Sequence, residues 1–166
     1  MKNLGGIFMN TKKLTKAGIV IALYVVLTYA FSSLAYGPLQ FRVSEILTLL
    51  AYLDPFYILP LVLGNALANI GSPFGIIDIV YGSFLSFLAL YSMSKTKNIY
   101  IASLWPAVFN AFIGLEIYLL SETPVNFFIV AGQIALSEFI IVSLIGIPIF
   151  KIMERNDYIM EMLKDN

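Results

Sequence analysis

The chain has 166 residues, of which 60% are hydrophobic and only 12% charged, and its mean hydropathy is +0.88. Soluble domains carry about twice that charged fraction, so the composition predicts one integral-membrane domain over residues 1–166. The sequence has no cysteine and no histidine, which excludes disulfides, thiol nucleophiles, Cys/His metal sites and His-based acid–base catalysis. Because the formal net charge is zero, we expect no nucleic-acid partner.

Five apolar stretches are candidates for membrane spans, each of which needs about 20 residues. Four of them are long and poor in charge. A fifth apolar stretch contains Asp54–Pro55, where the proline interrupts a helix, and we therefore divide it into two spans. One long span over residues 38–70 is the competing interpretation. The predicted spans are residues 16–34, 38–53, 55–70, 76–93, 99–120 and 125–150.

Basic residues predict the orientation, because cytoplasmic loops are rich in Lys and Arg. With six spans, all three basic groups fall on one side, whereas five spans would separate the last group from the others. We therefore predict an all-α protein of six transmembrane helices with both termini cytoplasmic. A short segment at about residues 1–15 precedes the first span, and an amphipathic tail at about 151–166 lies along the cytoplasmic interface. The three groups are Lys2, Lys12, Lys13 and Lys16; Lys95 and Lys97; and Lys151, Arg155 and Lys164.

Polar side chains inside the predicted spans lie in the outer half or at mid-depth, and this bias predicts a cavity that opens outward. Intramembrane ionisable groups are costly unless paired or hydrated, so they mark function. Asn65 and Asn69 share one helix face, where they alternatively join neighbouring helices; Asp78 alternatively caps its helix. The candidate binding residues are Gln40, Arg42, Glu45, Asn65, Asn69, Asp78, Asn110, Glu116, Gln133 and Glu138.

The candidate site contains more acids than bases, which predicts a ligand with N–H donors or a positive charge. Its one cation, Arg42, either pairs with Glu45 or contacts the ligand. Unpaired buried carboxylates such as those of Glu116 and Glu138 must take up a proton or find a cation. Residues 71–75 form a broken loop above the predicted cavity, of the kind that serves as a lid.

Gly18 and Ala22 place two small residues four apart on the first span. This spacing lets another helix approach closely. The approaching helix is either a neighbour within the bundle or a partner protein.

Three segments resemble the QueT family. Residues 36–50 read YGPLQFRVSEILTLL, residues 64–70 read GNALANI, and residues 72–82 read SPFGIIDIVYG; the start of the first span, residues 12–28, is also similar. The resemblance implies the substrate-binding S-component of an energy-coupling factor (ECF) transporter in the prokaryotic plasma membrane. Such components have six helices and an outward site, and they work with a scaffold membrane subunit and two cytoplasmic ATPases. Many dock on the scaffold through an Ala-xxx-Ala motif, at whose place this chain has Gly18 and Ala22.

The ligand implied by the resemblance is a queuosine precursor, a 7-deazaguanine such as preQ0, preQ1 or queuine. Its pairing edge carries N–H donors that suit a carboxylate, for which we expect Glu138 or Glu116. We expect Asp78 or Glu45 to bind the ammonium of a precursor with an aminomethyl arm. The ring carbonyl and nitrogens are left for amide side chains, namely Gln40, Asn69, Asn110 or Gln133.

Three other functions compete with this interpretation. An ion-coupled secondary carrier for a small base or cation would use the intramembrane acids as a proton relay, but such carriers often contain inverted repeats, which this sequence lacks. An intramembrane enzyme lacks a nucleophile placed beside a base, so we expect no catalytic residues and no cofactor. An assembly protein leaves the polar residues unexplained. The sequence also lacks a Gly-x-x-x-x-Gly-Lys loop, so any ATP dependence belongs to partners.

Overall fold

The computed structural model describes residues 11–37 and 39–164, and the regular secondary structure in these ranges is helical. The predicted N-terminal segment up to residue 10, Pro38 in the second predicted span, and the last two residues of the tail lie outside the described residues. In chain order the elements are α1 (Thr11–Ala30), α2 (Ser32–Ala35), η1 (Val43–Thr48), α3 (Leu49–Leu53), η2 (Pro55–Tyr57), α4 (Ile58–Ala68), η3 (Asn69–Gly71), α5 (Ile76–Lys95), α6 (Ile99–Ala102), α7 (Trp105–Asn110), α8 (Ile113–Leu120), α9 (Phe127–Glu138), η4 (Phe139–Gly146), α10 (Ile147–Glu154) and α11 (Asp157–Leu163), where η1 to η3 are 3-10 helices and η4 is a π-helix.

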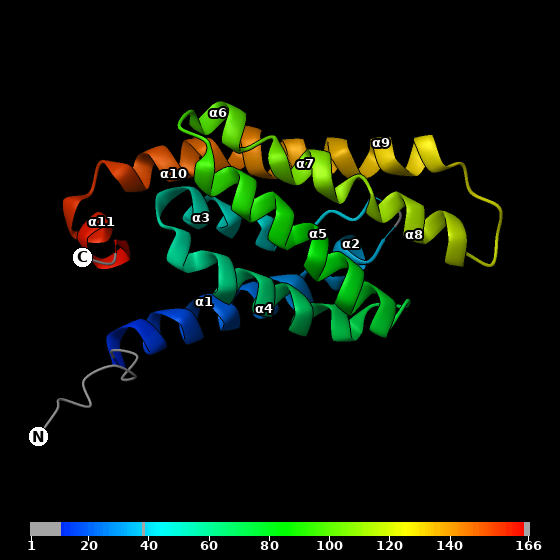
Figure 1. Cartoon of the computed structure of the whole chain (residues 1–166), viewed down its shortest axis with the longest axis horizontal. Coiled ribbons are helices and arrows are strands. Elements are labelled where there is room, and N and C mark those ends of the chain that lie inside the picture. Colours follow the sequence, from blue (N-terminus) through cyan, green and yellow to red (C-terminus); the bar gives the residue numbers. More distant parts are fainter. Residues whose placement is uncertain (1–10, 38, 165–166) are drawn as a thin grey trace, which may run out of the picture.

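The helices lie along the long axis of an elongated bundle (Figure 1). The start of α1 and the helix α11 lie at one end of the bundle, and the connection between α8 and α9 lies at the other. Contacts between α1 and α4 and between α7 and α9 join segments that are distant in the sequence, and α4 also packs against α5, the long helix that follows it. We call the end that holds the α8–α9 connection the distal end, and the end that holds α11 the terminal end.

Four helical runs are long and apolar enough to cross a membrane, which confirms four of the predicted spans with shifted bounds. These runs are Thr11–Ala30, Ile76–Lys95, Ile99–Leu120 and Phe127–Glu154. Two shorter apolar helices, Val43–Leu53 and Pro55–Gly71, occupy the places of the other two predicted spans. The last run ends at Glu154, so the first residues of the predicted amphipathic tail belong to a long helix rather than to a separate segment.

The predicted division at Asp54–Pro55 is confirmed. Asp54 has an extended backbone (φ −151°, ψ 124°), and its carboxylate accepts the N–H of Phe56 at 2.8 Å. Pro55 is the first residue of η2, where its missing N–H would have had no helical partner. The competing interpretation of one continuous span over residues 38–70 is therefore wrong.

The start predicted for the second span, at about residue 38, is also wrong, because residues 39–42 do not form a helix. Gln40 adopts a left-handed conformation (φ 51°), and Arg42 is extended. The helix that begins at Val43 is about 20 Å long at the usual rise per residue of 3-10 and α-helices. It is thus shorter than the roughly 30 Å hydrocarbon layer of a bilayer.

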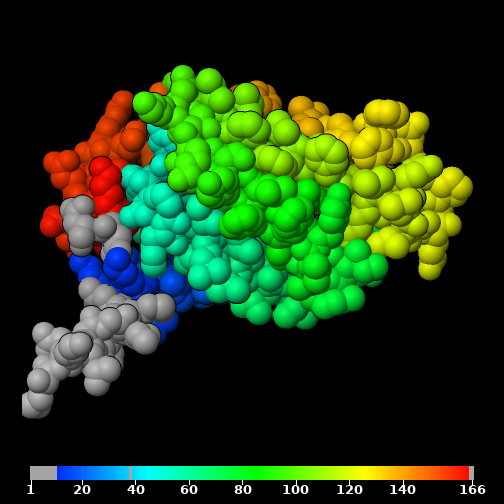
Figure 2. Space-filling model, viewed as in Figure 1, coloured from blue at the N-terminus to red at the C-terminus, as the bar shows by residue number. Residues whose placement is uncertain are grey.

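The distribution of polarity is the reverse of that in a soluble protein. Phe128, Ile76 and Leu119 are 80%, 69% and 67% exposed, respectively. The charged residues Arg42 and Glu138 are each only 3% exposed. Figure 2 shows the face formed by α4, α5 and α8, where exposed side chains of these helices make up the surface. An apolar surface around a polar interior suits a protein whose surroundings are lipid.

The helix α11 packs back against the start of the bundle. The hydroxyl of Tyr57 donates to the carbonyl of Leu163 at 2.6 Å, and Nζ of Lys16 donates to the carbonyl of Lys164 at 3.2 Å. These contacts bring the two ends of the described chain to the same end of the bundle.

Candidate functional site

The interior of the bundle contains a cluster of polar side chains contributed by five separate parts of the chain. Of the ten binding residues predicted from the sequence, nine are buried, and Gln133 is half-buried. This burial is a property of the fold. The assignment of these residues to a ligand stays a prediction.

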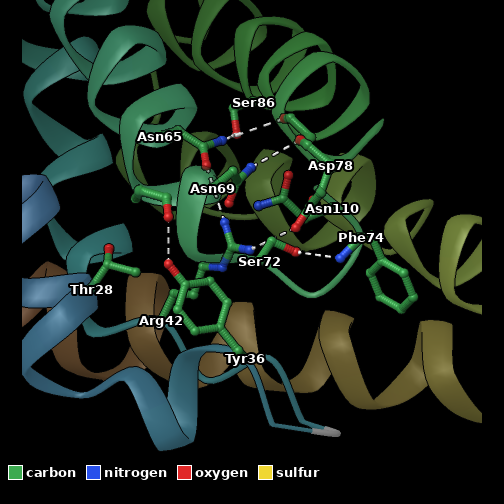
Figure 3. Close-up of polar contacts among 12 residues, drawn as sticks. Thr28, Tyr36, Arg42, Asn65, Asn69, Ser72, Phe74, Asp78, Ser86 and Asn110 are labelled. Carbon is green, nitrogen blue, oxygen red and sulfur yellow. Dashed lines mark hydrogen bonds and ion pairs between the residues drawn. The ribbon is translucent and has the colours of Figure 1, made fainter. Parts of the chain in front are cut away.

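Arg42 lies at the centre of the cluster. The backbone of residues 39–42 is not helical, and the side chain of Arg42 points from this segment toward α4 and α5 (Figure 3). Its Nη1 donates to Oδ1 of Asn65 at 3.1 Å, and its Nη2 lies 3.6 Å from Oδ2 of Asp78. The guanidinium carbon is also 5.7 Å from the centre of the Tyr36 ring, within the range of a cation–π contact. The ion pair of Arg42 is therefore with Asp78, and the pairing with Glu45 considered from the sequence does not form.

Two asparagines on one face of α4 and η3 connect the cluster to α5. The amide Nδ2 of Asn65 donates to the hydroxyl of Ser86 and, at 3.4 Å, to the carbonyl of Gly82. The amide Nδ2 of Asn69 donates to the carbonyl of Asp78 at 3.0 Å (Figure 3). Both asparagines thus join neighbouring helices, as the alternative interpretation of the sequence held. Asp78 does not cap α5, because its carboxylate is buried beside Arg42 and the helix has Gly75 at its cap position.

Gly82 and Ser86 belong to this cluster, although the sequence analysis did not select them. A Cβ atom at Gly82 would lie 2.9 Å from Nδ2 of Asn69 and 2.9 Å from Oδ1 of Asp78, so any larger residue there would have to displace these side chains. Asp78, Gly82 and Ser86 are spaced four residues apart and therefore share one face of α5. This spacing is the sequence signal from which Gly82 and Ser86 could have been selected.

Glu45 is held by a residue that the sequence analysis did not select either. The hydroxyl of Tyr24 on α1 donates to Oε1 of Glu45, and both side chains are buried. Nearby, the hydroxyls of Thr28 and Ser44 lie 2.8 Å apart. Tyr24 has no distinguishing signal in the sequence, because a tyrosine in an apolar helix is usually explained by packing or by the membrane interface.

The opposite wall of the cluster comes from α7 and α9. The amide Nδ2 of Asn110 donates to Oε1 of Glu138 at 2.7 Å. The second carboxylate oxygen of Glu138 and Oδ1 of Asn110 are buried and have no hydrogen-bond partner in the part of the chain that the structure describes. The hydroxyl of Ser137 reaches the carbonyl of Gln40 at 3.5 Å, which joins α9 to the left-handed turn before Arg42.

Two adjoining cavities reach this cluster. The inner one has a volume of only about 10 Å³. The outer one, of about 430 Å³, lies at the distal end and has Tyr36, Phe74 and Gln133 among its lining residues. Gln40 lines both, so the two cavities meet at this residue. The inner cavity is lined by Gln40, Arg42, Glu45, Asn65, Ser86, Asn110, Ile113, Ile134 and Glu138.

The ten candidate residues do not all face these cavities. Glu116 is buried, and neither of its carboxylate oxygens has a hydrogen-bond partner in residues 11–37 or 39–164, but it lines neither cavity. Asn69 and Asp78 also line neither cavity; Asp78 pairs with Arg42, and Asn69 donates to the carbonyl of Asp78. A further cavity of about 470 Å³, which includes Lys151 and Arg155 in its lining, lies on the part of the bundle formed by α6 and α10, away from the acids. We take the two cavities that share Gln40 as the candidate site, because the inner one is lined by the buried acids Glu45 and Glu138 and the outer one shares Gln40 with it.

Charge in the candidate site is unbalanced. Arg42 is neutralised by Asp78, and the carboxyl groups of Glu45 and Glu138 remain on the wall of the inner cavity without a cation within ion-pair distance among the described residues. Buried carboxylates without a cation are costly. The site is therefore suited to a molecule that brings N–H donors or a positive charge.

Gly18 and Ala22 lie on the outer surface of α1. Both are exposed, and a Cβ atom added at Gly18 would meet no other atom within 4 Å. Exposed apolar residues surround them, including Ile19 at 54% and Val26 at 61%. Of the two interpretations offered by the sequence, internal packing is thus wrong for this pair, and contact with a partner stays a prediction.

Comparison with known proteins adds a family to this geometry. The profile of the family described as "QueT transporter" matches residues 14–155. The chain belongs to the QueT transporter family. A relative, the queuosine precursor transporter QueT of Lactococcus lactis subsp. cremoris (strain MG1363), is 32% identical over 146 residues, a match that covers 78% of this chain and 85% of the relative. No solved structure matches the chain.

Membership of the QueT family agrees with the resemblance found in the sequence and with the apolar surface of the bundle. Its members are transporters, and the several apolar helices place this member in the cell membrane as a multi-pass protein. The matched region includes every candidate binding residue and both small residues of α1.

Proposed function

We propose that this protein is the substrate-binding membrane subunit of an ECF-type importer and that it takes up a queuosine precursor, a 7-deazaguanine such as preQ0, preQ1 or queuine. The observation that carries the proposal is the pair of cavities joined at Gln40. An outer pocket of about 430 Å³, with Tyr36 and Phe74 in its lining, meets at Gln40 a buried cluster in which acids outnumber the single arginine. The name of the Lactococcus lactis relative supports the ligand class.

The proposed topology has six spans with both termini in the cytoplasm. The shorter helices Val43–Leu53 and Pro55–Gly71 form a pair within the bundle, and the ends of the described chain lie together at the terminal end. With the terminal end in the cytoplasm, the three groups of basic residues agree with the positive-inside rule. The outer pocket then faces the outside of the cell.

The proposed partners are an ECF scaffold membrane subunit and two cytoplasmic ATPases. The exposed small residues Gly18 and Ala22 give α1 a smooth face that suits close contact with another helix, which supports docking of the scaffold there. ATP hydrolysis falls to the partners, since this chain carries no phosphate-binding loop of its own.

Uptake measured in two kinds of proteoliposome tests the proposal. Vesicles that hold this protein alone should bind a labelled 7-deazaguanine precursor without accumulating it, and vesicles that also hold the scaffold and ATPases should accumulate it when ATP is inside. Accumulation by the protein alone, driven by a proton gradient, would instead establish the secondary carrier. Absence of binding by well-folded protein would reject the ligand class.

A further inference from the structure

The inner cavity is lined by residues whose buried hydrogen-bonding atoms have no hydrogen-bond partner within residues 11–37 and 39–164. The acceptors are Oε2 of Glu138, Oδ1 of Asn110 and Oε1 of Gln40, and the donors are Nε and Nη2 of Arg42, of which Nη2 also takes part in the ion pair with Asp78. Each of these residues is more than nine-tenths buried. Buried polar groups in folded proteins are almost always satisfied, so these atoms define the chemistry of what this wall can bind.

The acceptors and donors match one side of a heterocyclic base. Oε2 of Glu138 is unpartnered, and Oε1, which accepts from Asn110, has a second lone pair. A carboxylate with both oxygens accessible accepts two parallel N–H donors. A guanine-type ring offers such a pair in its ring N1–H and its 2-amino group, and its neighbouring 6-oxygen needs a donor.

We infer that Glu138, together with Asn110, accepts the N1–H and 2-amino donors of a 2-amino-6-oxo base, and that Arg42 donates to its 6-oxygen. This inference rests on the proposed function and narrows it to one recognition mode. It selects Glu138 over Glu116 for the base edge, because Glu116 lines neither cavity. Asp78 keeps the guanidinium in place and does not bind the ligand directly.

The two cavities set the orientation of the ring. About 10 Å³ holds no more than a single water molecule, so the ring must come from the outer pocket and displace the side chain of Gln40. The lining residues follow one face of α9, with Val130 in the outer cavity and Ile134 and Glu138 in the inner one. The C7 substituent lies on the five-membered ring, away from N1 and the 2-amino group, and therefore stays in the outer pocket between Tyr36 and Phe74.

A series of ligands with altered edges tests this recognition mode on the purified wild-type protein by isothermal calorimetry. The series is 7-deazaguanine, 7-deazahypoxanthine, which lacks the 2-amino group, and 7-deazaadenine, which reverses the donors and acceptors at positions 1 and 6. We expect affinity to fall about 10- to 100-fold without the 2-amino group, as for a lost charge-assisted hydrogen bond, and binding of 7-deazaadenine to be undetectable. Cyano and aminomethyl groups at C7 should change the affinity far less than loss of the 2-amino group does.

A variant pair tests the assignment to Glu138. Glu138→Gln replaces one acceptor oxygen by a donor, so the ratio of affinities for 7-deazaguanine and 7-deazahypoxanthine should fall toward one. The matched control, Asp54→Asn, is the same chemical change at the terminal end and should keep the wild-type ratio. The ligand series on the wild type needs no variant, so it decides the recognition mode even where Glu138→Gln fails to fold.

The outcomes separate this inference from the proposed function. If queuosine precursors bind and 7-deazahypoxanthine binds within about threefold of 7-deazaguanine, the recognition mode is wrong and the proposed function stands. Loss of discrimination in Glu116→Gln and not in Glu138→Gln would also overturn it. If no 7-deazaguanine binds to folded wild-type protein, both the recognition mode and the proposed function are wrong.

Discussion

Nη2 of Arg42 lies 3.6 Å from Oδ2 of Asp78, and both side chains are almost completely buried. The two residues come from different parts of the chain, Arg42 from the non-helical segment before η1 and Asp78 from the first turn of α5. Since Asn65 also accepts from Arg42, this one guanidinium connects the segment before η1 to both α4 and α5. The contact neutralises the arginine and leaves the other buried acids without it.

Loss of Asp78 should therefore destabilise the fold. Asp78→Ala leaves the guanidinium buried without its counter-ion, and we expect a loss of about 3–5 kcal/mol in the free energy of unfolding. Unfolding in mixed detergent micelles measures it. The double variant Arg42→Met/Asp78→Ala should recover part of the loss, because it removes the unpaired charge; a double variant as unstable as the sum of both single changes would contradict this account.

Gly82→Ala should disturb the same contacts sterically. The added methyl group would lie 2.9 Å from the amide of Asn69 and from the carboxylate of Asp78, and crowding of this kind typically costs about 1–3 kcal/mol. Gly132→Ala on α9 is the matched control, since its Cβ atom meets nothing within 4 Å and alanine favours a helix. Thermal unfolding of the two variants should shift in opposite directions, with the Gly82 variant melting lower than the wild type.

Tyr24→Phe removes the hydroxyl that donates to Glu45. The carboxyl group then remains buried without this donor, for which we expect a cost of about 1–3 kcal/mol. The control is Tyr52→Phe, whose hydroxyl donates to the carbonyl of Lys97 at an exposed position and should cost far less. Equal melting temperatures for both variants would show that the buried hydrogen bond from Tyr24 to Glu45 stabilises the fold no more than the exposed one from Tyr52.

Gly18→Leu should separate docking from ligand binding. The position is open in the described structure, so the bulky side chain should leave folding and the affinity for a 7-deazaguanine unchanged. Contact with a scaffold helix at this surface should be lost. Copurification with the scaffold and ATP-dependent uptake should therefore fall at least tenfold, whereas Gly132→Leu, also at an open glycine, should keep both. Normal uptake by the Gly18 variant would exclude this face of α1 as the docking surface.

The long helices could be predicted from the sequence because each depends on one local property, the length of an apolar run. The break at Asp54–Pro55 could be predicted for the same reason, since the proline and the capping carboxylate act within three residues. The bend of the chain at residues 39–42 could not. It depends on the left-handed backbone of Gln40, a residue type that rarely adopts it.

That bend explains why the set of candidate residues was better predicted than their pairing. Polar residues in a hydrophobic sequence are conspicuous, and nine of the ten selected ones are buried. The partner of Arg42 was sought three residues away at Glu45, as in a regular helix. The extended backbone instead directs the arginine to Asp78, and Glu45 bonds to Tyr24. Such contacts between distant segments need the tertiary structure.

The shortness of the helix Val43–Leu53 bears on how the protein enters the membrane during synthesis. A segment of about 20 Å that follows a buried arginine is a poor candidate for independent insertion. The tight turn at Asp54–Pro55 joins it to Pro55–Gly71, so the translocation machinery should receive the two as one helical hairpin. A nascent chain that ends within the turn should stay outside the bilayer, and one that extends past Gly71 should integrate. Biogenesis would then bring Arg42 and Asn65 into the hydrocarbon layer together, already within reach of each other.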